Sequence, residues 1–331
     1  MAALQNLLFL ASQYAQQGRL QDMQVMVDKA LDADESVTAR VQAAHLCLEY
    51  GLVTRARDLY ESVLSDDPDG VAAQAGLARI ATETGEHSQA TAIYTRLVEQ
   101  HPDSDTLRRN ALVALEYDPV VSQAQRFEAA IQWGQWAISQ AGGAHPSQEM
   151  KGLSGRAPRV GFVSADFCQH TVGLFVKDVL AVLGQRWPVY VYHARKQEDW
   201  VSKLIQTTCH WRSVVDMDDA MLADQIRQDE IDILVDLSGH TAGSRLTAFA
   251  HRPAPVMVSW LGYFATTGLP YVDAVLLDAG HVGSEVEERF VERVVALPAG
   301  RFFYKAVPWA PKTVAMPPCL SRGYVTFGCF N

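Results

Sequence analysis

The sequence predicts a solenoid of paired helices followed by an α/β region with a parallel sheet. Two observations support this prediction. In the first third of the chain, glycines recur at spacings of 33 and 34 residues, and the residues after them align without gaps, as in a helical repeat. After residue 158, short apolar segments alternate with segments of helical periodicity, which is typical of parallel sheets built from strand and helix units.

The repeats occupy residues 1–104 and are marked by Gly18, Gly51 and Gly85. Equivalent positions after the second and third glycines hold Ala56, Tyr60, Leu64 and Pro68, then Ala90, Tyr94, Val98 and Pro102. Offsets of four residues place these side chains on one helical face. The pattern resembles the tetratricopeptide repeat, whose solenoid presents a groove for partner polypeptides but does no chemistry. The alternative is a helical layer that only supports the next domain.

Two segments connect the repeats to the α/β region. Residues 105–141 keep a helical pattern in LRRNALVALEYDP and RFEAAIQWGQWAI but lose the 34-residue period, so we expect a pair of bridging helices. Residues 142–158 are rich in Gly, Ser and Pro, which indicates a linker.

Strands and helices alternate within residues 159–322. The clearest strand, 231–237, reads IDILVDL and is apolar on both faces apart from two aspartates, as expected for a buried parallel strand. The other expected strands are 159–164, 189–193, 211–215, 256–261, 272–277 and 294–297. Helices are expected near 174–183, 198–207, 219–227 and 245–251. This alternation predicts a doubly wound sheet with right-handed crossovers.

Ligands of such sheets bind beyond the carboxyl ends of the strands. The residues expected at these ends are Ser164, Asp166, His170, His193, Ser238, Gly239, His240, Thr241, Gly262, Tyr263 and Asp278. Histidines and hydroxyls therefore converge on one edge of the sheet. We expect a ligand-binding crevice there.

Composition limits the classes of function. The net charge is −10, and such a chain lacks the basic surplus that nucleic-acid binding requires. The five cysteines include no C-x-x-C pair, so we expect reduced thiols in a cytoplasmic protein. The amino-terminal apolar run has no basic region before it, which argues against a signal peptide or a membrane span.

Several kinds of site lack their motif. No G-x-G-x-x-G follows the first strand, and neither a P-loop nor a G-x-S-x-G elbow occurs, so dinucleotide binding and serine hydrolysis are unsupported. Asp216 and Asp218 form a D-x-D, which holds a metal in some sugar-transferring enzymes. Such a spacing arises easily among 38 acidic residues, and we predict no metal site.

His170 and His240 are the candidates for chemistry. His170 lies four residues after Asp166 in the loop that follows the first strand, where an imidazole can take a proton from an attacking hydroxyl. The alternative is a loop histidine bonded to a nearby carbonyl. Gly239 permits an unusual backbone turn before His240, and Thr241 is placed to cap the next helix.

Three motifs occur in order after the repeats: GFVSADFCQHTVG, DILVDLSGHTAGSRL and HRPAPVMVSWLGYFATTGLPYVDAVLLD. They resemble the amino-terminal catalytic half of the O-GlcNAc transferase and SPINDLY family of protein glycosyltransferases. The resemblance implies a Rossmann-like half of a GT-B fold and a metal-independent, inverting transfer of a sugar from a nucleotide donor to Ser or Thr of proteins.

The same resemblance assigns roles to residues and ligands. It implies that His170 is catalytic and that Asp166, His240, Thr241, Gly262 and Tyr263 bind substrate. The donor is UDP-GlcNAc or GDP-fucose, with GlcNAc favoured, and no cofactor is implied. Acceptor proteins are expected to approach through the repeat groove.

The chain also departs from the family pattern. Thr171 follows His170 where the family has proline, and Phe264 follows Tyr263 where proline is again usual. Residues 323–331 resemble the first strand of the second half, to which the family's donor-binding lysine, uracil contacts and threonine-rich loop belong. We therefore expect these 331 residues to be inactive by themselves. The alternative is a repeat-based binding module or a degenerate, non-catalytic family member.

Overall fold

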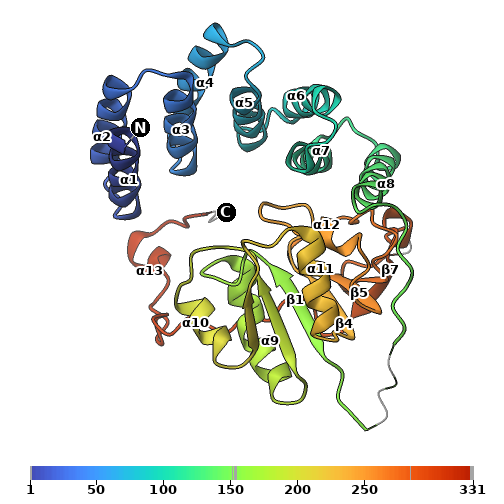
Figure 1. Ribbon diagram of the computed structural model, residues 1–331. Helices are drawn as coiled ribbons and strands as arrows, with labels where there is room; N and C mark the ends of the chain where they lie inside the picture. Colours follow the sequence, from blue (N-terminus) through green and yellow to red (C-terminus); the bar gives the residue numbers. More distant parts are fainter. Residues whose placement is uncertain (1, 151, 153–154, 284, 329–331) are drawn as a thin grey trace.

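The computed structural model describes residues 2–150, 152, 155–283 and 285–328. An arc of helices stands over an α/β half (Figure 1). The helices that precede the first strand are α1 (Ala2–Gln16), α2 (Leu20–Ala33), α3 (Val37–Glu49), α4 (Val53–Asp66), α5 (Val71–Glu83), α6 (His87–Gln100), α7 (Asp105–Tyr117) and α8 (Gln123–Gln140).

The predicted repeat is present as three helix pairs, α1–α2, α3–α4 and α5–α6. Gly18, Gly51 and Gly85 lie in the turns inside the pairs with positive φ angles of 75°, 78° and 86°, which glycine adopts without steric cost. Tyr60 is fully buried. A Cβ at Gly76 would lie 2.3 Å from its ring, so the small residue lets neighbouring helices approach closely.

Within the described residues, seven parallel strands form one sheet in the order β3-β2-β1-β4-β5-β6-β7. The strands are β1 (Val160–Ser164), β2 (Val189–His193), β3 (His210–Ser213), β4 (Ile233–Asp236), β5 (Val256–Trp260), β6 (Ala274–Asp278) and β7 (Arg293–Leu297). The chain reverses its winding between β1 and β4. In doubly wound sheets, the crevice beyond the strands lies at such a switch point.

Helices cover both faces of the sheet. They are α9 (Thr171–Gly184), α10 (Trp200–Gln206), α11 (Asp219–Gln228) and the short α12 (Leu246–Phe249). Phe162 of β1 packs in one apolar core with α9 and α10, whereas its neighbour Val163 packs in another with α11 and α12. α12 is shorter than predicted because the chain turns at Arg252 (φ 48°) ahead of Pro253, whose ring disfavours a helical residue before it.

α8 belongs to the second of these cores. Trp133 and Ala137 of α8 are buried together with Leu234 of β4 and Met257 of β5. A Cβ at Gly134 would lie 2.0 Å from the carbonyl oxygen of Gly268. The predicted bridging helix is therefore part of the packing that supports the sheet.

Beyond β7 the chain returns across α9 and α10. Phe302 contacts Phe175 of α9, with ring centroids 5.2 Å apart, and Trp309 contacts Trp200 at the same distance. The single-turn η1 (Glu287–Arg289) precedes β7, and α13 (Pro318–Arg322) follows this return.

The predicted strand at 323–331 is not formed over residues 323–328, where no neighbouring strand pairs with the chain. Residues 329–331 lie outside the described residues. Among the described helices, none has the length and apolar character needed to cross a bilayer.

Candidate functional site

The carboxyl ends of β1 and β4 meet at the switch point. The hydroxyls of Ser164 and Ser238 are buried and 3.0 Å apart. The backbone N–H of Asp166 donates to Ser164 Oγ at 2.9 Å, while the carboxyl of Asp236 accepts the backbone N–H groups of Ser238 and Gly239. Serine and aspartate side chains thus hold the two loops that follow these strands.

His170 is the N-cap residue of α9, and its side chain is 47% exposed. Its Nδ1 accepts the backbone N–H of Val172 at 3.3 Å and lies 3.7 Å from Asp166 Oδ2. The two contacts are alternatives, because a protonated Nδ1 can donate only to the carboxylate and an unprotonated one can only accept. Burial raises the pKa of Asp166, against the opposing effect of His170, Arg195 and His193.

His240 differs sharply from His170, since it is 1% exposed. Its Nε2 donates to the carbonyl of Thr267 at 2.9 Å. The ring stands edge-on to Trp133 of α8 and to Tyr263, with centroids 4.5 and 5.3 Å apart. Burial lowers the pKa of His240 to about 3, so the imidazole is neutral and serves in hydrogen bonding.

Glycines allow the loops after β4 and β5 to touch. A Cβ at Gly262 would lie 1.7 Å from the carbonyl oxygen of Leu237, and one at Gly239, which has a φ of 55°, would lie 2.2 Å from Cβ of Tyr263. Tyr263 is itself buried, and burial raises the pKa of its hydroxyl. Gly262 and Tyr263 therefore shape the wall behind His240.

Thr241 connects this wall to the helical arc. Its carbonyl accepts Nη1 of Arg109 at 2.9 Å, while Nε of the same guanidinium donates to Asp105 at 2.7 Å. Arg109 lies on α7 and is buried. The hydroxyl of Thr241 donates to the carbonyl of Ser238 at 2.7 Å, so the predicted helix-capping role is replaced by a turn contact.

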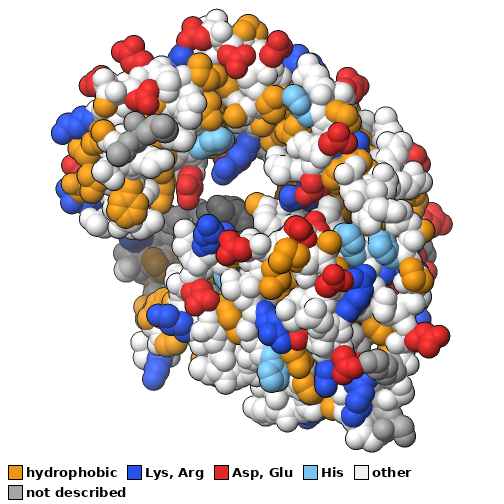
Figure 2. All heavy atoms as spheres, viewed as in Figure 1, with side chains coloured by type: hydrophobic (Ala, Val, Ile, Leu, Met, Phe, Trp, Pro, Cys, Tyr) orange, Lys and Arg blue, Asp and Glu red, His pale blue; other side chains and the backbone are white. Residues whose placement is uncertain are grey.

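A cleft of about 620 Å³ lies between the helices α5–α7 and the loop that carries His240. Its lining residues are Arg79, Thr82, Glu83, Tyr94, Thr106, Arg109, Asn110, Val113, Ala114, His240, Thr241, Ala242 and Gly243. In the space-filling view, the molecule is hollowed between the arc and the α/β half (Figure 2). The cleft thus joins the repeat surface to the carboxyl ends of the strands.

Two predicted edge residues do not share this site. His193 is fully buried, with its ring against Trp211 at 4.7 Å, and burial lowers its pKa. Asp278 accepts the backbone N–H groups of Gly280 and Arg301 at the end of β6. Asp218 of the D-x-D caps α11 by accepting the N–H of Met221.

Sequence reasoning missed Arg109 and Glu292. Glu292 is 3% exposed and accepts hydrogen bonds from Thr266 and Thr267, behind His240. Both residues act over a long separation in the chain, and no local pattern marks them. The proximity of α7 to the loop after β4 is a property of the tertiary structure.

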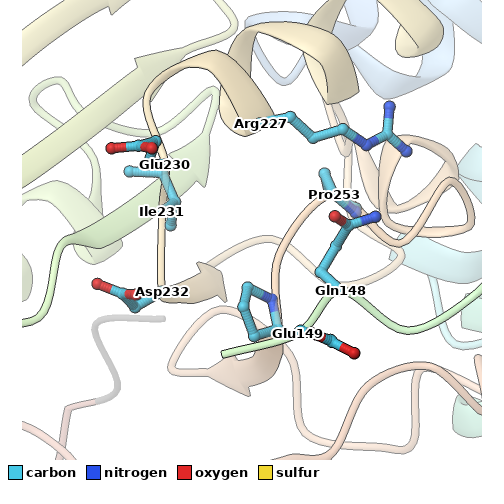
Figure 3. A pocket seen from close by; sticks show the side chains of 8 residues that line it. Gln148, Glu149, Arg227, Glu230, Ile231, Asp232 and Pro253 are labelled. Atoms are coloured by element: carbon cyan, nitrogen blue, oxygen red, sulfur yellow. The ribbon is translucent and has the colours of Figure 1, made fainter. Parts of the chain in front are cut away.

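A second, smaller hollow of about 130 Å³ lies at the opposite edge of the sheet. Figure 3 shows Glu230 and Asp232 on one side of it and Gln148 and Glu149 on the other. Asp232 is engaged by the guanidinium of Arg156, with two contacts of 2.7 Å. These charges hold the linker to the start of β4, and we assign no ligand to the hollow.

Comparison with known families gives two matches. The model described as Glycosyl transferase family 41 matches residues 135–306, just over half of the chain. A Tetratricopeptide repeat model matches residues 47–115.

Known proteins resemble the chain over the same regions. It is 35% identical over 236 residues to the Arabidopsis thaliana protein described as probable UDP-N-acetylglucosamine–peptide N-acetylglucosaminyltransferase SPINDLY, covering 70% of the chain and 26% of that protein. The protein SEC of the same plant is 32% identical over 143 residues, covering 42% of the chain and 15% of SEC. The chain thus spans about a quarter, or less, of the length of these relatives.

A solved structure matches nearly the whole chain. It is a mutant of the Thermobaculum terrenum O-GlcNAc transferase, with a TM-score of 0.79 and 27% identity. The match covers 94% of this chain and 61% of that one. It includes both the helical arc and the parallel sheet, as the shared coverage requires.

Proposed function

Because the chain belongs to glycosyltransferase family 41, we propose that it forms the acceptor-binding side of a protein O-glycosyltransferase. The reaction moves a sugar from a nucleotide donor to a Ser or Thr hydroxyl. GlcNAc is the favoured sugar, and fucose is the other candidate. The observation that carries this proposal is the cleft that runs from α5–α7 to the loop of His240. An extended acceptor polypeptide fits a cleft lined by one wall of repeat helices and one wall of strand ends.

His170 is the proposed general base. It is half exposed at the start of α9, and a carboxylate stands 3.7 Å from its Nδ1. When the proton is on Nδ1, on the side of the Asp166 carboxylate, Nε2 carries the lone pair and takes the proton of the acceptor hydroxyl. The hydroxyl oxygen then forms the bond to the sugar C1, and the nucleoside diphosphate leaves from the opposite face. This displacement inverts the anomeric centre without a metal ion or cofactor.

The remaining predicted residues bind the acceptor or shape the cleft that holds it. Thr241, held by Arg109, and His240 form the floor of the acceptor cleft, while Gly262 and Tyr263 support that floor from behind. Asp166 orients His170. Stabilisation of the leaving diphosphate needs fixed positive groups, which the family resemblance places in a second half. From its membership of this family, we also propose that the protein acts in the cytoplasm.

The proposed acceptor and base are tested together. We expect the 331 residues to bind Ser/Thr-containing peptides but to transfer no sugar from UDP-GlcNAc or GDP-fucose. In the longest natural form that contains them, His170→Ala should lower kcat by about 10²–10⁴-fold, the usual contribution of a general base. His281→Ala is the matched control, because His281 is 78% exposed beside Asp278.

The outcomes separate the rival functions. Transfer by the 331 residues alone would contradict the need for a second half. Unchanged turnover in His170→Ala would remove this residue from the mechanism. Peptide binding without transfer in the longest natural form would favour the binding-module alternative, in which the cleft recruits a partner protein.

A further inference from the structure

Glu292 is a buried carboxylate placed immediately before β7. Thr266 Oγ1 donates to its Oε2 at 2.7 Å, and the backbone N–H of Thr267 donates to its Oε1 at the same distance. The hydroxyl of Thr267 also donates to Oε1. One side chain from beyond η1 thus holds the loop that follows β5.

Among the described residues, both threonine hydroxyls donate to Glu292 and to no other acceptor. Thr266 Oγ1 already accepts the N–H groups of Gly268 and Val291, at 3.1 and 3.2 Å, and Thr267 Oγ1 accepts that of Leu269 at 3.2 Å. Each hydroxyl hydrogen is therefore directed at Glu292. A glutamine amide in its place would turn one acceptor into a donor, which opposes a donating group.

The loop that Glu292 holds fixes a ring in the cleft. The carbonyl of Thr267 accepts Nε2–H of His240 at 2.9 Å. The other nitrogen, Nδ1, is buried and has no hydrogen-bond partner among the described residues. His240 nevertheless lines the cleft. A buried acceptor without a partner costs free energy unless a ligand supplies a donor.

We propose that Glu292 is a positioning residue: through Thr267 it holds His240 as the Nε2–H tautomer, which leaves the buried Nδ1 as an unpaired acceptor for an N–H or O–H of the polypeptide in the cleft. The polypeptide ligand rests on the proposed function, whereas the tautomer does not. The low pKa of His240, caused by burial, supports a neutral ring whose Nδ1 is an acceptor at neutral pH.

The first test reads the tautomer directly. In protein labelled with ¹⁵N-histidine, NMR should show His240 of the wild type with a protonated Nε2 and an unprotonated Nδ1. Glu292→Gln should produce a mixture of both tautomers. Glu288→Gln should leave the wild-type pattern, because Glu288 is exposed in the same segment. If folded Glu292→Gln keeps His240 entirely as the Nε2–H tautomer, the proposal is overturned and Glu292 has a structural role only.

A second variant keeps the test decisive if Glu292→Gln does not fold. Thr267→Val removes one of the donors to Glu292 but keeps the backbone N–H, so it should shift the tautomer less. Thr267→Ser keeps the hydroxyl and should restore the wild-type signals. A mixture in Thr267→Ser as large as that in Thr267→Val would contradict the hydroxyl's part in the chain of contacts.

The third test asks whether Glu292 affects ligand binding through His240. Using a Ser/Thr-containing peptide, we expect Glu292→Gln and His240→Phe each to weaken binding by up to about tenfold, the value of one net hydrogen bond. The double variant should bind no more weakly than His240→Phe, because both changes remove the same contact. Additive losses would overturn the coupling. A wild type that binds no peptide would instead reject the proposed acceptor site, while the tautomer result stands by itself.

Discussion

Asp236 shows how burial changes a single residue of the switch point. Its carboxyl is 1% exposed, and desolvation outweighs the hydrogen bonds from Gly239 and Ser238, so its pKa rises to about 7. In an unfolded chain the pKa is about 3.9. Between these values the native state binds a proton that the unfolded state does not. The contribution of the protonated Asp236 to stability is therefore present below about pH 4 and is lost as the pH rises towards 7.

Asp236→Asn tests this linkage, since an amide does not ionise. We expect the free energy of unfolding of the wild type to fall more steeply between pH 4.5 and 7.5 than that of the variant. The two proteins should differ in this fall by on the order of 1.4 kcal/mol for each unit by which folding raises the pKa of Asp236. Urea unfolding at both pH values measures the two free energies. Asp216→Asn, an exposed control, should keep the wild-type dependence. Parallel curves for the wild type and Asp236→Asn would contradict the assignment.

The histidines mark the limit of sequence reasoning at this scale. His170 and His240 follow strands and His193 ends one, and the strand-end rule places all three on one edge of the sheet. Only His170 keeps an exposed ring, whereas His193 and His240 are buried. The rule predicts the edge but not the exposure, because exposure depends on Trp211 and Trp133, which pack from other elements.

At the scale of elements, α8 packs closely against the loop after β5. Replacing an interior helical glycine by alanine normally raises helix stability by about 1 kcal/mol. At Gly134 the added Cβ would lie 2.0 Å from the carbonyl oxygen of Gly268. We therefore expect Gly134→Ala to lower the free energy of unfolding by about 1–3 kcal/mol, as overpacking does.

Denaturant unfolding measures this change. Gly283→Ala is the matched control, because an added Cβ there meets no heavy atom within 4 Å, and it should stay within about 0.5 kcal/mol of the wild type. A stabilised Gly134→Ala would show that α8 can move away from the sheet without cost.

Periodicity predicted the elements well, and local chemistry explains where it did not. The expected strand at 189–193 coincides with β2, and the helix expected at 219–227 differs from α11 by one residue. α12 ends early because of the turn at Arg252. Residues 323–328 have the apolar pattern of a strand but no partner strand, and a strand requires hydrogen bonds from a neighbour.

For the whole molecule, Arg109 forms a polar link between the helical arc and the α/β half. It joins α7 to the carbonyl of Thr241 at 2.9 Å and is itself buried. A hydrogen bond from a charged group contributes about 1.5–3 kcal/mol. Arg109→Ala should therefore speed amide hydrogen exchange in the loop of residues 238–244 by roughly 10–100-fold.

Hydrogen exchange with mass spectrometry checks this expectation. Arg19→Ala removes an arginine that is 51% exposed and paired with Asp22, so it should leave the loop unchanged. Equal protection of the loop in Arg109→Ala and the wild type would mean that apolar packing of α8 alone holds the two parts together.

The sequence by itself determined the order and type of the elements, the repeat, and the edge of the sheet where His170 and His240 follow their strands. These features depend on periods of two to four residues and on spacings along the chain, which can be read locally. Only the tertiary structure decided that His240 is buried, that α8 enters the sheet's core, and that Arg109 and Glu292 support the cleft. Desolvation and long-range hydrogen bonds arise from segments brought together by folding, and no local pattern encodes them.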